Sequence, residues 1–195
     1  MPLPKDKNHI DDEELNNVLQ TARKANDEML GRFGHRATSF NTESDEIIAC
    51  KTSQLRLAIR SFAECSRVMN TAQGYIERIN EIELNSIKVQ ATLEATYNAI
   101  KNSILAVLGS AGSADSRIAR AEGAMMNIVF LLDLEKGLQR ICKSARETID
   151  DAASNASRAQ TGLEYELKYL DPRIVSQETL DAIKAVENEQ KPQWK

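Results

Sequence analysis

A seven-residue repeat of apolar positions runs through residues 42–108, a stretch that contains no proline. One line of core positions starts at Ile48 and a second starts at Lys51, and each recurs every seven residues. Fourteen of these eighteen positions are apolar or aromatic, and three of the four exceptions lie together as Glu83, Ser86 and Gln90. Such a repeat over many turns predicts a long helix that packs in coiled-coil fashion.

The polar interruption at residues 83–90 leaves two structures open. Beside it, the apolar residues Ile82, Ile87 and Val89 move to the flanks of the core lines. If the helix continues through this segment, we expect a rod with an interactive end. If the chain instead folds back at residues 80–86, we expect a compact bundle.

Helical patterns account for most of the remaining chain. The four predicted helices span residues 12–33, 43–108, 116–170 and 177–189. Asp11 is expected to cap the first helix and Thr42 the second, with a linker over residues 35–41 between them. A glycine-rich loop over residues 109–115 separates the two long helices, and Pro172 ends the third helix.

The ends of the chain differ from this helical pattern. Residues 1–10 contain two prolines and scattered charge, which predicts a disordered arm. Residues 191–195 are expected to form a short tail. A single helical domain is therefore predicted over residues 11–190.

The predicted fold is all-α and is dominated by a long antiparallel hairpin. A seven-residue loop between two long amphipathic helices favours this arrangement. With the turn near Gly112, facing residues have numbers that add to about 224, twice 112, which sets the alanine-rich stretch 145–159 against the larger side chains of 65–79. The short N- and C-terminal helices are expected to lie at the open end of the hairpin, where they complete a three- or four-helix bundle.

This arrangement leaves the loop end of the hairpin with only two helices and with exposed apolar side chains. Exposed apolar area of this kind usually marks an interface. The residues expected to contact a second copy or a protein partner are Ile104, Leu108, Met125, Met126, Val129 and Phe130. A second candidate surface, for an acidic partner, consists of Arg56, Arg60 and Arg67, although a solvated coiled-coil flank is the favoured interpretation of these residues.

No catalytic, metal or cofactor site is predicted. His9 and His35 fall in expected loops and have no cysteine or acidic residue at the spacing of metal ligands. The glutamates of residues 77–94 lack the histidines that a di-iron bundle requires. The loop beginning at Gly109 neither follows a strand nor ends in Gly-Lys-Ser/Thr, as a phosphate-binding loop would. The three cysteines form no metal-binding motif and are expected to be buried thiols: Cys50, Cys65 and Cys142.

Charge and hydropathy limit the partners and the location. The net charge of −4 and the pI of about 5.4 argue against nucleic-acid binding, and no small-molecule substrate is evident. The sequence begins without a signal-peptide pattern and contains no apolar run of about eighteen residues, the length of a membrane span. We therefore expect a cytoplasmic protein, with export by a signal-independent route left open.

The sequence predicts a non-enzymatic interaction or scaffold protein. It would self-associate or bind a protein partner through the apolar end of the hairpin and through its coiled-coil faces. The alternative is a membrane-active hairpin of the pore-forming or translocator type, in which the same apolar residues would face lipid. The scaffold is the favoured interpretation.

Overall fold

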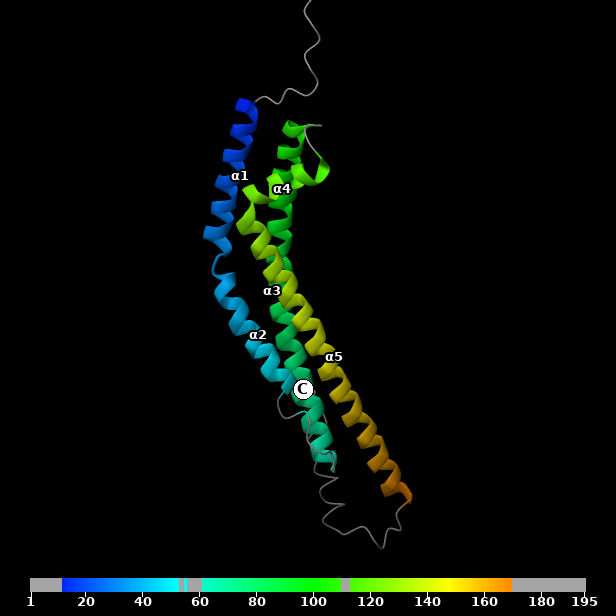
Figure 1. Cartoon of the computed structure of the whole chain (residues 1–195). Coiled ribbons are helices and arrows are strands. Elements are labelled where there is room, and N and C mark those ends of the chain that lie inside the picture. The colour runs from blue at the N-terminus through cyan, green and yellow to red at the C-terminus, as the bar shows by residue number, and fades with distance from the viewer. Residues whose placement is uncertain (1–11, 53–54, 56–60, 110–112, 170–195) are drawn as a thin grey trace, which may run out of the picture. The chain divides into compact units, whose positions relative to one another are not determined.

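The computed structural model describes residues 12–52, 55, 61–109 and 113–169 (Figure 1). The helices are α1 (Asp12–Phe33), α2 (Arg36–Thr52), α3 (Phe62–Leu108), α4 (Ala114–Ala124) and α5 (Met126–Tyr169). No strand occurs in these ranges, which confirms the all-α class. The predicted arm, C-terminal helix and tail lie outside the described residues.

The start of the second predicted helix is wrong. Only Gly34 and His35 separate α1 from α2, so the predicted linker is helical and Thr42 is not an N-cap. The amide of Ala37 donates to the carbonyl of Gly34 at 3.2 Å, which begins the new helix at once. So short a connection does not reverse the chain, and α2 therefore extends away from the end of α1 (Figure 1).

The helix predicted over residues 43–108 is divided into two. Described helix ends at Thr52 and resumes at Phe62. Ser61 caps the new helix, because its Oγ accepts the Glu64 amide at 3.2 Å. From there α3 continues through residues 83–90 without a break, so the predicted alternative of a fold-back at residues 80–86 is wrong.

The third predicted helix is also divided. Ser113 caps α4, since its Oγ accepts the Ser116 amide at 3.2 Å. The helix ends at Met125, which has φ −122° and ψ 29°, and α5 follows immediately. In α5 the buried side chains recur at helical spacing and include Ile128, Leu131, Leu138, Cys142, Ala145 and Ile149.

The chain divides into two compact units, each containing part of α3 and part of α5. Unit 1 comprises the described residues of 1–45 and 82–141, and unit 2 those of 46–81 and 142–195. The predicted single domain over residues 11–190 and the long hairpin both stay predictions.

The core of unit 1 joins α1, α3, α4 and α5. Its members from α1 are Leu15, Ala22, Met29 and Phe33, and those from α3 include Leu93, Ile100, Ile104 and Leu108. Burying one such side chain contributes about 1.5–3 kcal/mol. The first helix therefore packs against the loop end of α3, and its predicted place at the open end of the hairpin is wrong.

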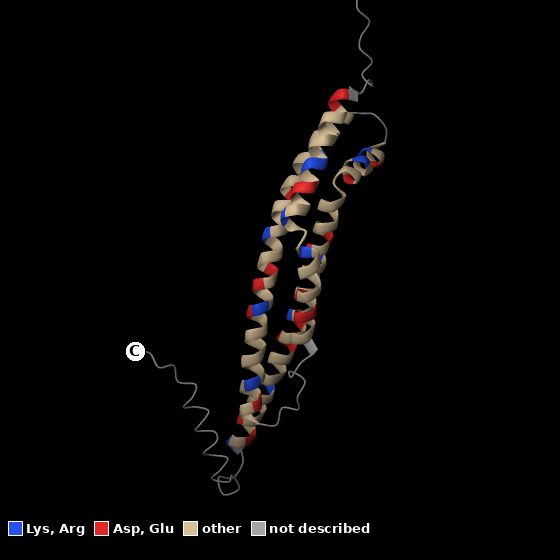
Figure 2. Cartoon of the chain, turned by 90° about the vertical axis from the view of Figure 1, so that its left-hand side faces the viewer, with Lys and Arg blue, Asp and Glu red and all other residues tan. Residues whose placement is uncertain are grey.

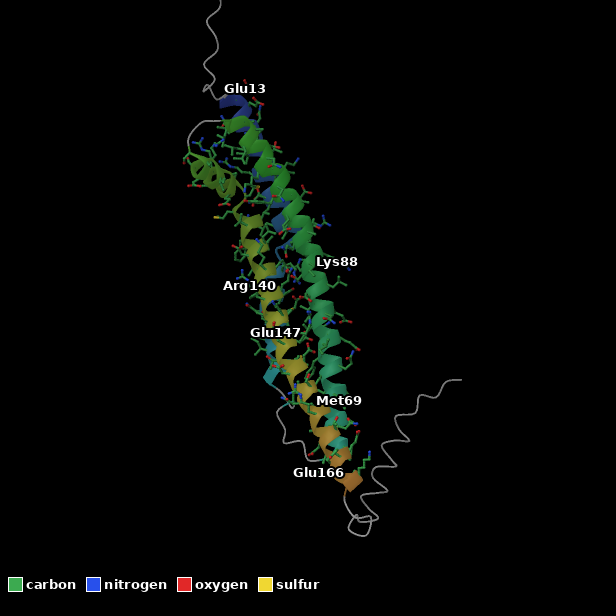
Figure 3. All side chains as sticks on the ribbon, turned by 90° about the vertical axis from the view of Figure 1, so that its right-hand side faces the viewer. Glu13, Met69, Lys88, Arg140, Glu147 and Glu166 are labelled. Carbon is green, nitrogen blue, oxygen red and sulfur yellow. The ribbon has the colours of Figure 1, made fainter. Side chains whose placement is uncertain are left out.

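In unit 2, the first part of α3 and the later part of α5 lie side by side in the views of both Figure 1 and Figure 3. Arg78 of α3 donates from Nε to Glu46 of α2 at 2.7 Å. This bond lowers the pKa of Glu46, and it raises that of Arg78. All three cysteines are buried here, as predicted, and burial raises the pKa of the Cys50 and Cys65 thiols.

The inner face of α3 follows one of the two predicted core lines. The line that starts at Lys51 is buried at Cys65, Ala72, Ile79, Ser86, Leu93 and Ile100. Ile82 and Val89, which were predicted to lie on a flank of the helix, are also buried, with 4% and 8% of their surface exposed. The line that starts at Ile48 is half-buried over much of α3. Of the polar residues that interrupt the repeat, Ser86 is therefore part of a continuous buried stripe, whereas Glu83 and Gln90 are half-buried.

Candidate partner-binding surface

The six apolar residues predicted to form a contact surface lie in two different environments. Three are inside the core of unit 1, where Ile104 and Met125 are 0% exposed and Leu108 is 2% exposed. Val129 is half-buried. Met126 and Phe130 point to solvent, with 69% and 51% of their surface exposed.

A helix cap from another part of the chain holds the exposed pair in place. The side-chain Oδ1 of Asn26, on α1, accepts the amides of Asn127 at 3.0 Å and Ile128 at 3.2 Å. These are among the first N–H groups of α5, which have no partner within their own helix. Because Met125 precedes α5 and has no side-chain oxygen, Asn26 provides the cap from α1 and fixes where α5, and with it Met126, begins.

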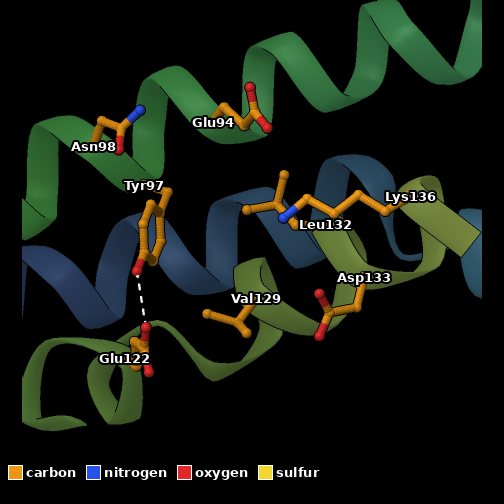
Figure 4. A pocket seen from close by; sticks show the side chains of 8 residues that line it. All are labelled: Glu94, Tyr97, Asn98, Glu122, Val129, Leu132, Asp133 and Lys136. Atoms are coloured by element: carbon orange, nitrogen blue, oxygen red, sulfur yellow. Dashed lines mark hydrogen bonds between the residues drawn. The ribbon is translucent and has the colours of Figure 1, made fainter. Parts of the chain in front are cut away.

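A cavity of about 280 Å³ lies beside this first part of α5 (Figure 4). It is lined by Glu94, Tyr97 and Asn98 of α3, Glu122 of α4, and Val129, Leu132, Asp133 and Lys136 of α5. The Tyr97 hydroxyl donates to Glu122 Oε1 at 3.1 Å, which joins α3 to α4 at the cavity wall. On a helix with about 100° between residues, Met126 and Phe130 lie on the flank of α5 next to Asp133.

The cavity is acidic. Three carboxylates line it against a single ammonium group, that of Lys136. Glu94 accepts a bond from Gln90 Nε2 at 2.7 Å, which orients its carboxylate. The volume is just below the ~300–1,000 Å³ typical of small-molecule sites. A single long, cationic side chain with an apolar stem therefore matches the space and charge of this cavity.

A buried ion pair joins two helices of unit 1. Arg36 of α2, 3% exposed, donates from Nε and Nη2 to Glu135 of α5, at 2.7 and 3.0 Å. It also donates to Glu43 at 2.8 and 3.0 Å. The bond to Glu135 raises the pKa of Arg36 above its ordinary value, so the guanidinium is charged at every pH of interest.

A second set of polar contacts links α3 to α5 next to the ion pair. Ser86 Oγ donates to the backbone carbonyl of Glu135 at 3.3 Å. Gln139 Nε2 donates to Ser86 Oγ at 3.3 Å and to Gln90 Oε1 at 2.6 Å. Ser86 and Gln90, two of the three polar residues that interrupt the sequence repeat, therefore form hydrogen bonds with the neighbouring helix.

Part of this polar core can be predicted from the sequence. Glu135 occupies the heptad position between Ile128 and Cys142, and Ser86 occupies the one between Ile79 and Leu93. A polar residue on an otherwise apolar line predicts a buried hydrogen-bond partner. The contribution of Arg36 could not be found in this way, because it lies 99 residues away from Glu135.

The second predicted surface is only partly described. Arg56 and Arg60 lie outside the described residues, and Arg67 is exposed on α3 in unit 2. Among the residues that the structure describes, no group of three His, Cys, Asp or Glu side chains could hold a metal ion. No described helix combines the length and the apolar character needed to cross a membrane.

Comparison of this chain with protein-family models, with curated proteins and with solved structures found no match.

Proposed function

We propose that this chain is a non-enzymatic helical scaffold that binds a protein partner through the surface formed by Met126, Phe130 and the adjacent acidic cavity. The observation that carries this proposal is the exposure of two large apolar side chains on one flank of α5, at 69% and 51%. Exposed apolar side chains that lie together beside a cavity are typical of binding surfaces.

The charge of the cavity indicates the chemistry of the partner. An amphipathic helix that lays its apolar side on Met126 and Phe130 could place a lysine or arginine between Glu94, Glu122 and Asp133. The apolar stem of that side chain would contact Val129 and Leu132, while its charge would meet the carboxylates. Helix-in-groove recognition commonly uses apolar anchors spaced three and four residues apart.

The test uses two designed amphipathic peptides with the same leucine face, one flanked by lysines and the other by glutamates. Binding of each fluorescent peptide is measured by anisotropy at low and high salt. We expect the lysine peptide to bind more tightly, and we expect added salt to weaken its binding because the charges are partly exposed. Equal affinities for both peptides would contradict the proposed acidic site.

Two matched variants test the apolar part of the surface. Phe130→Glu places a charge on the proposed surface, whereas Leu30→Glu places the same charge at an exposed leucine of α1, 41% exposed. We expect Phe130→Glu to abolish binding of the lysine peptide and Leu30→Glu to leave it unchanged. The same variants, used as baits in the cells that produce the protein, identify natural partners as those lost with Phe130→Glu alone.

A further inference from the structure

In the part of the chain that the structure describes, a hydrogen bond joins a glutamine to the glutamate one helical turn later in three pairs: Gln73–Glu77, Gln90–Glu94 and Gln160–Glu164. The first and third pairs are exposed, whereas the second is partly buried and its glutamate lines the acidic cavity. Gln90 differs in a second way, because its Oε1 accepts a bond from Gln139 Nε2 of α5 at 2.6 Å. The Glu94 carboxylate is therefore held by a side chain that is itself held from another helix.

The Glu94 carboxylate sets the direction of every hydrogen bond in this group. An ionised carboxylate only accepts, so Gln90 must present its amide nitrogen to Glu94 and its oxygen to α5. That oxygen requires a donor, so Gln139 presents its nitrogen, which also donates to Ser86 Oγ at 3.3 Å. The Ser86 hydroxyl then donates its proton to the backbone carbonyl of Glu135, at 3.3 Å. These bonds form together in one orientation of each group, so a continuous chain of contacts runs from the core of unit 1 to the cavity.

This chain of hydrogen bonds orders the Glu94 side chain at the α3 wall of the cavity (Figure 4). Glu94 is half-buried, and an untethered glutamate side chain would sample several rotamers there. Ordering such a side chain on binding costs free energy. The bond from Gln90 occupies Oε1 and leaves Oε2 for a ligand, on a carboxylate that is already ordered. Preorganisation of this kind raises affinity without adding a contact.

We propose that Gln90 and Gln139 are positioning residues of the acidic cavity, which make its Glu94 carboxylate selective for a cationic side chain of a partner. This role rests on the proposed function, since that function places the cationic side chain in the cavity. Gln139 does not line the cavity and reaches Glu94 through Gln90. A change at Gln139 should therefore alter the recognition of charge at a site that it does not touch.

The test compares the lysine peptide described above with a peptide that has the same leucine face and glutamines in place of the lysines. The ratio of the two affinities, here called the lysine preference, is measured by anisotropy. Gln90→Met and Gln139→Met remove the amide donors and keep the length of the side chain. We expect each to lower the lysine preference about two- to tenfold, because Glu94 must then be ordered on binding.

Gln73→Met is the matched control, because it removes the same kind of donor from an exposed pair of α3 in unit 2. We expect it to leave the lysine preference unchanged. A merely structural effect of a variant would weaken the binding of both peptides together and would leave their ratio intact. Gln139→Asn, which keeps the amide on a shorter side chain, is the milder variant if Gln139→Met lowers the melting temperature, and it too should lower the lysine preference.

A double-mutant cycle tests whether Gln90 acts through Glu94. Glu94→Gln removes the charge, and on this background Gln90→Met should leave the affinity for the lysine peptide unchanged, because no carboxylate remains to be positioned. A further loss on this background overturns the proposal.

The parent chain separates failure of this proposal from failure of the proposed function. A parent chain that binds the lysine and glutamine peptides equally overturns both. A parent chain that prefers the lysine peptide, with this preference retained or increased in Gln90→Met and Gln139→Met, overturns the positioning role alone.

Discussion

Removing one partner of the buried ion pair in unit 1 should destabilise the protein far more than removing both. Glu135 is 1% exposed, and its two oxygens accept bonds from Arg36 at 2.7 and 3.0 Å. The variants are Glu135→Leu, Arg36→Met and the double variant that combines them. Each single variant leaves a buried charge with fewer partners, whereas the double variant replaces the pair with apolar side chains of similar length.

The expected costs follow from what each variant leaves behind. Breaking a buried pair costs about 3–5 kcal/mol. Glu135→Leu should fall near 3 kcal/mol, at the lower end of that range, because Arg36 keeps its two bonds to Glu43. Arg36→Met should cost about 4 kcal/mol, because the Glu135 carboxylate is left buried without a cation. The double variant should lie within about 1 kcal/mol of the parent, since apolar replacement of a buried pair is often neutral.

Urea unfolding at pH 7, followed by circular dichroism, measures these differences as a double-mutant cycle. Single variants that each cost less than about 1 kcal/mol would show that water reaches the pair, because exposed pairs contribute that little. A double variant as unstable as the sum of the singles would show that the two residues do not compensate each other. Either result refutes the buried pair as the link between α2 and α5.

Three further predictions concern single contacts. Asn26→Ala should cost about 1–2 kcal/mol in urea unfolding, because the α5 cap is lost, and Asn26→Asp should retain most of that stability. The bond from Arg78 lowers the pKa of Glu46 below its ordinary value. The pair therefore stabilises the fold fully at a pH above the ordinary carboxyl pKa. This stabilisation is lost as the pH falls through the lowered pKa of Glu46. Both side chains are more than a third exposed, so Glu46→Gln should change the unfolding free energy by less than about 0.5 kcal/mol at pH 7, and by less still in urea unfolding at acidic pH. The Cys65 thiol, 0% exposed and with a raised pKa, should react with a thiol reagent only as fast as the protein unfolds, and rapid labelling of the native protein would contradict its burial.

Local patterns in the sequence predicted the helices better than their breaks. The bounds of α1 agree with the prediction because Asp11 and Gly34 flank an amphipathic segment. The break before α3 also had a signal, since Ser61 and Glu64 have the spacing of a capping box. The apolar repeat continues through residues 53–60 and outweighed that signal. Periodicity records which face is buried, and it does not record whether one helix or two provide that face.

The contacts that define the candidate surface depend on distant parts of the chain. Asn26 caps α5 from about one hundred residues away, and α1 covers Ile104 and Leu108. Because the sequence pattern does not indicate this packing, it predicts Ile104, Leu108 and Met125 to be exposed, like Met126 and Phe130. The structure separates them because α1 packs on the loop end of α3, where Ile104, Leu108 and Met125 belong to the same buried core.

The two sides of α3 in unit 1 show what a count of apolar positions leaves out. The buried line of α3 accommodates Ser86 because Glu135 and Gln139 provide partners, so polar residues occur inside the helix pair. Alanine and asparagine are frequent among the exposed residues of α3 over residues 84–106, whereas Figure 2 shows acidic and basic residues interspersed along other parts of the helices. Polarity alone therefore does not distinguish the buried side of α3 from its exposed side, and the partners that α5 provides for Ser86 make that distinction.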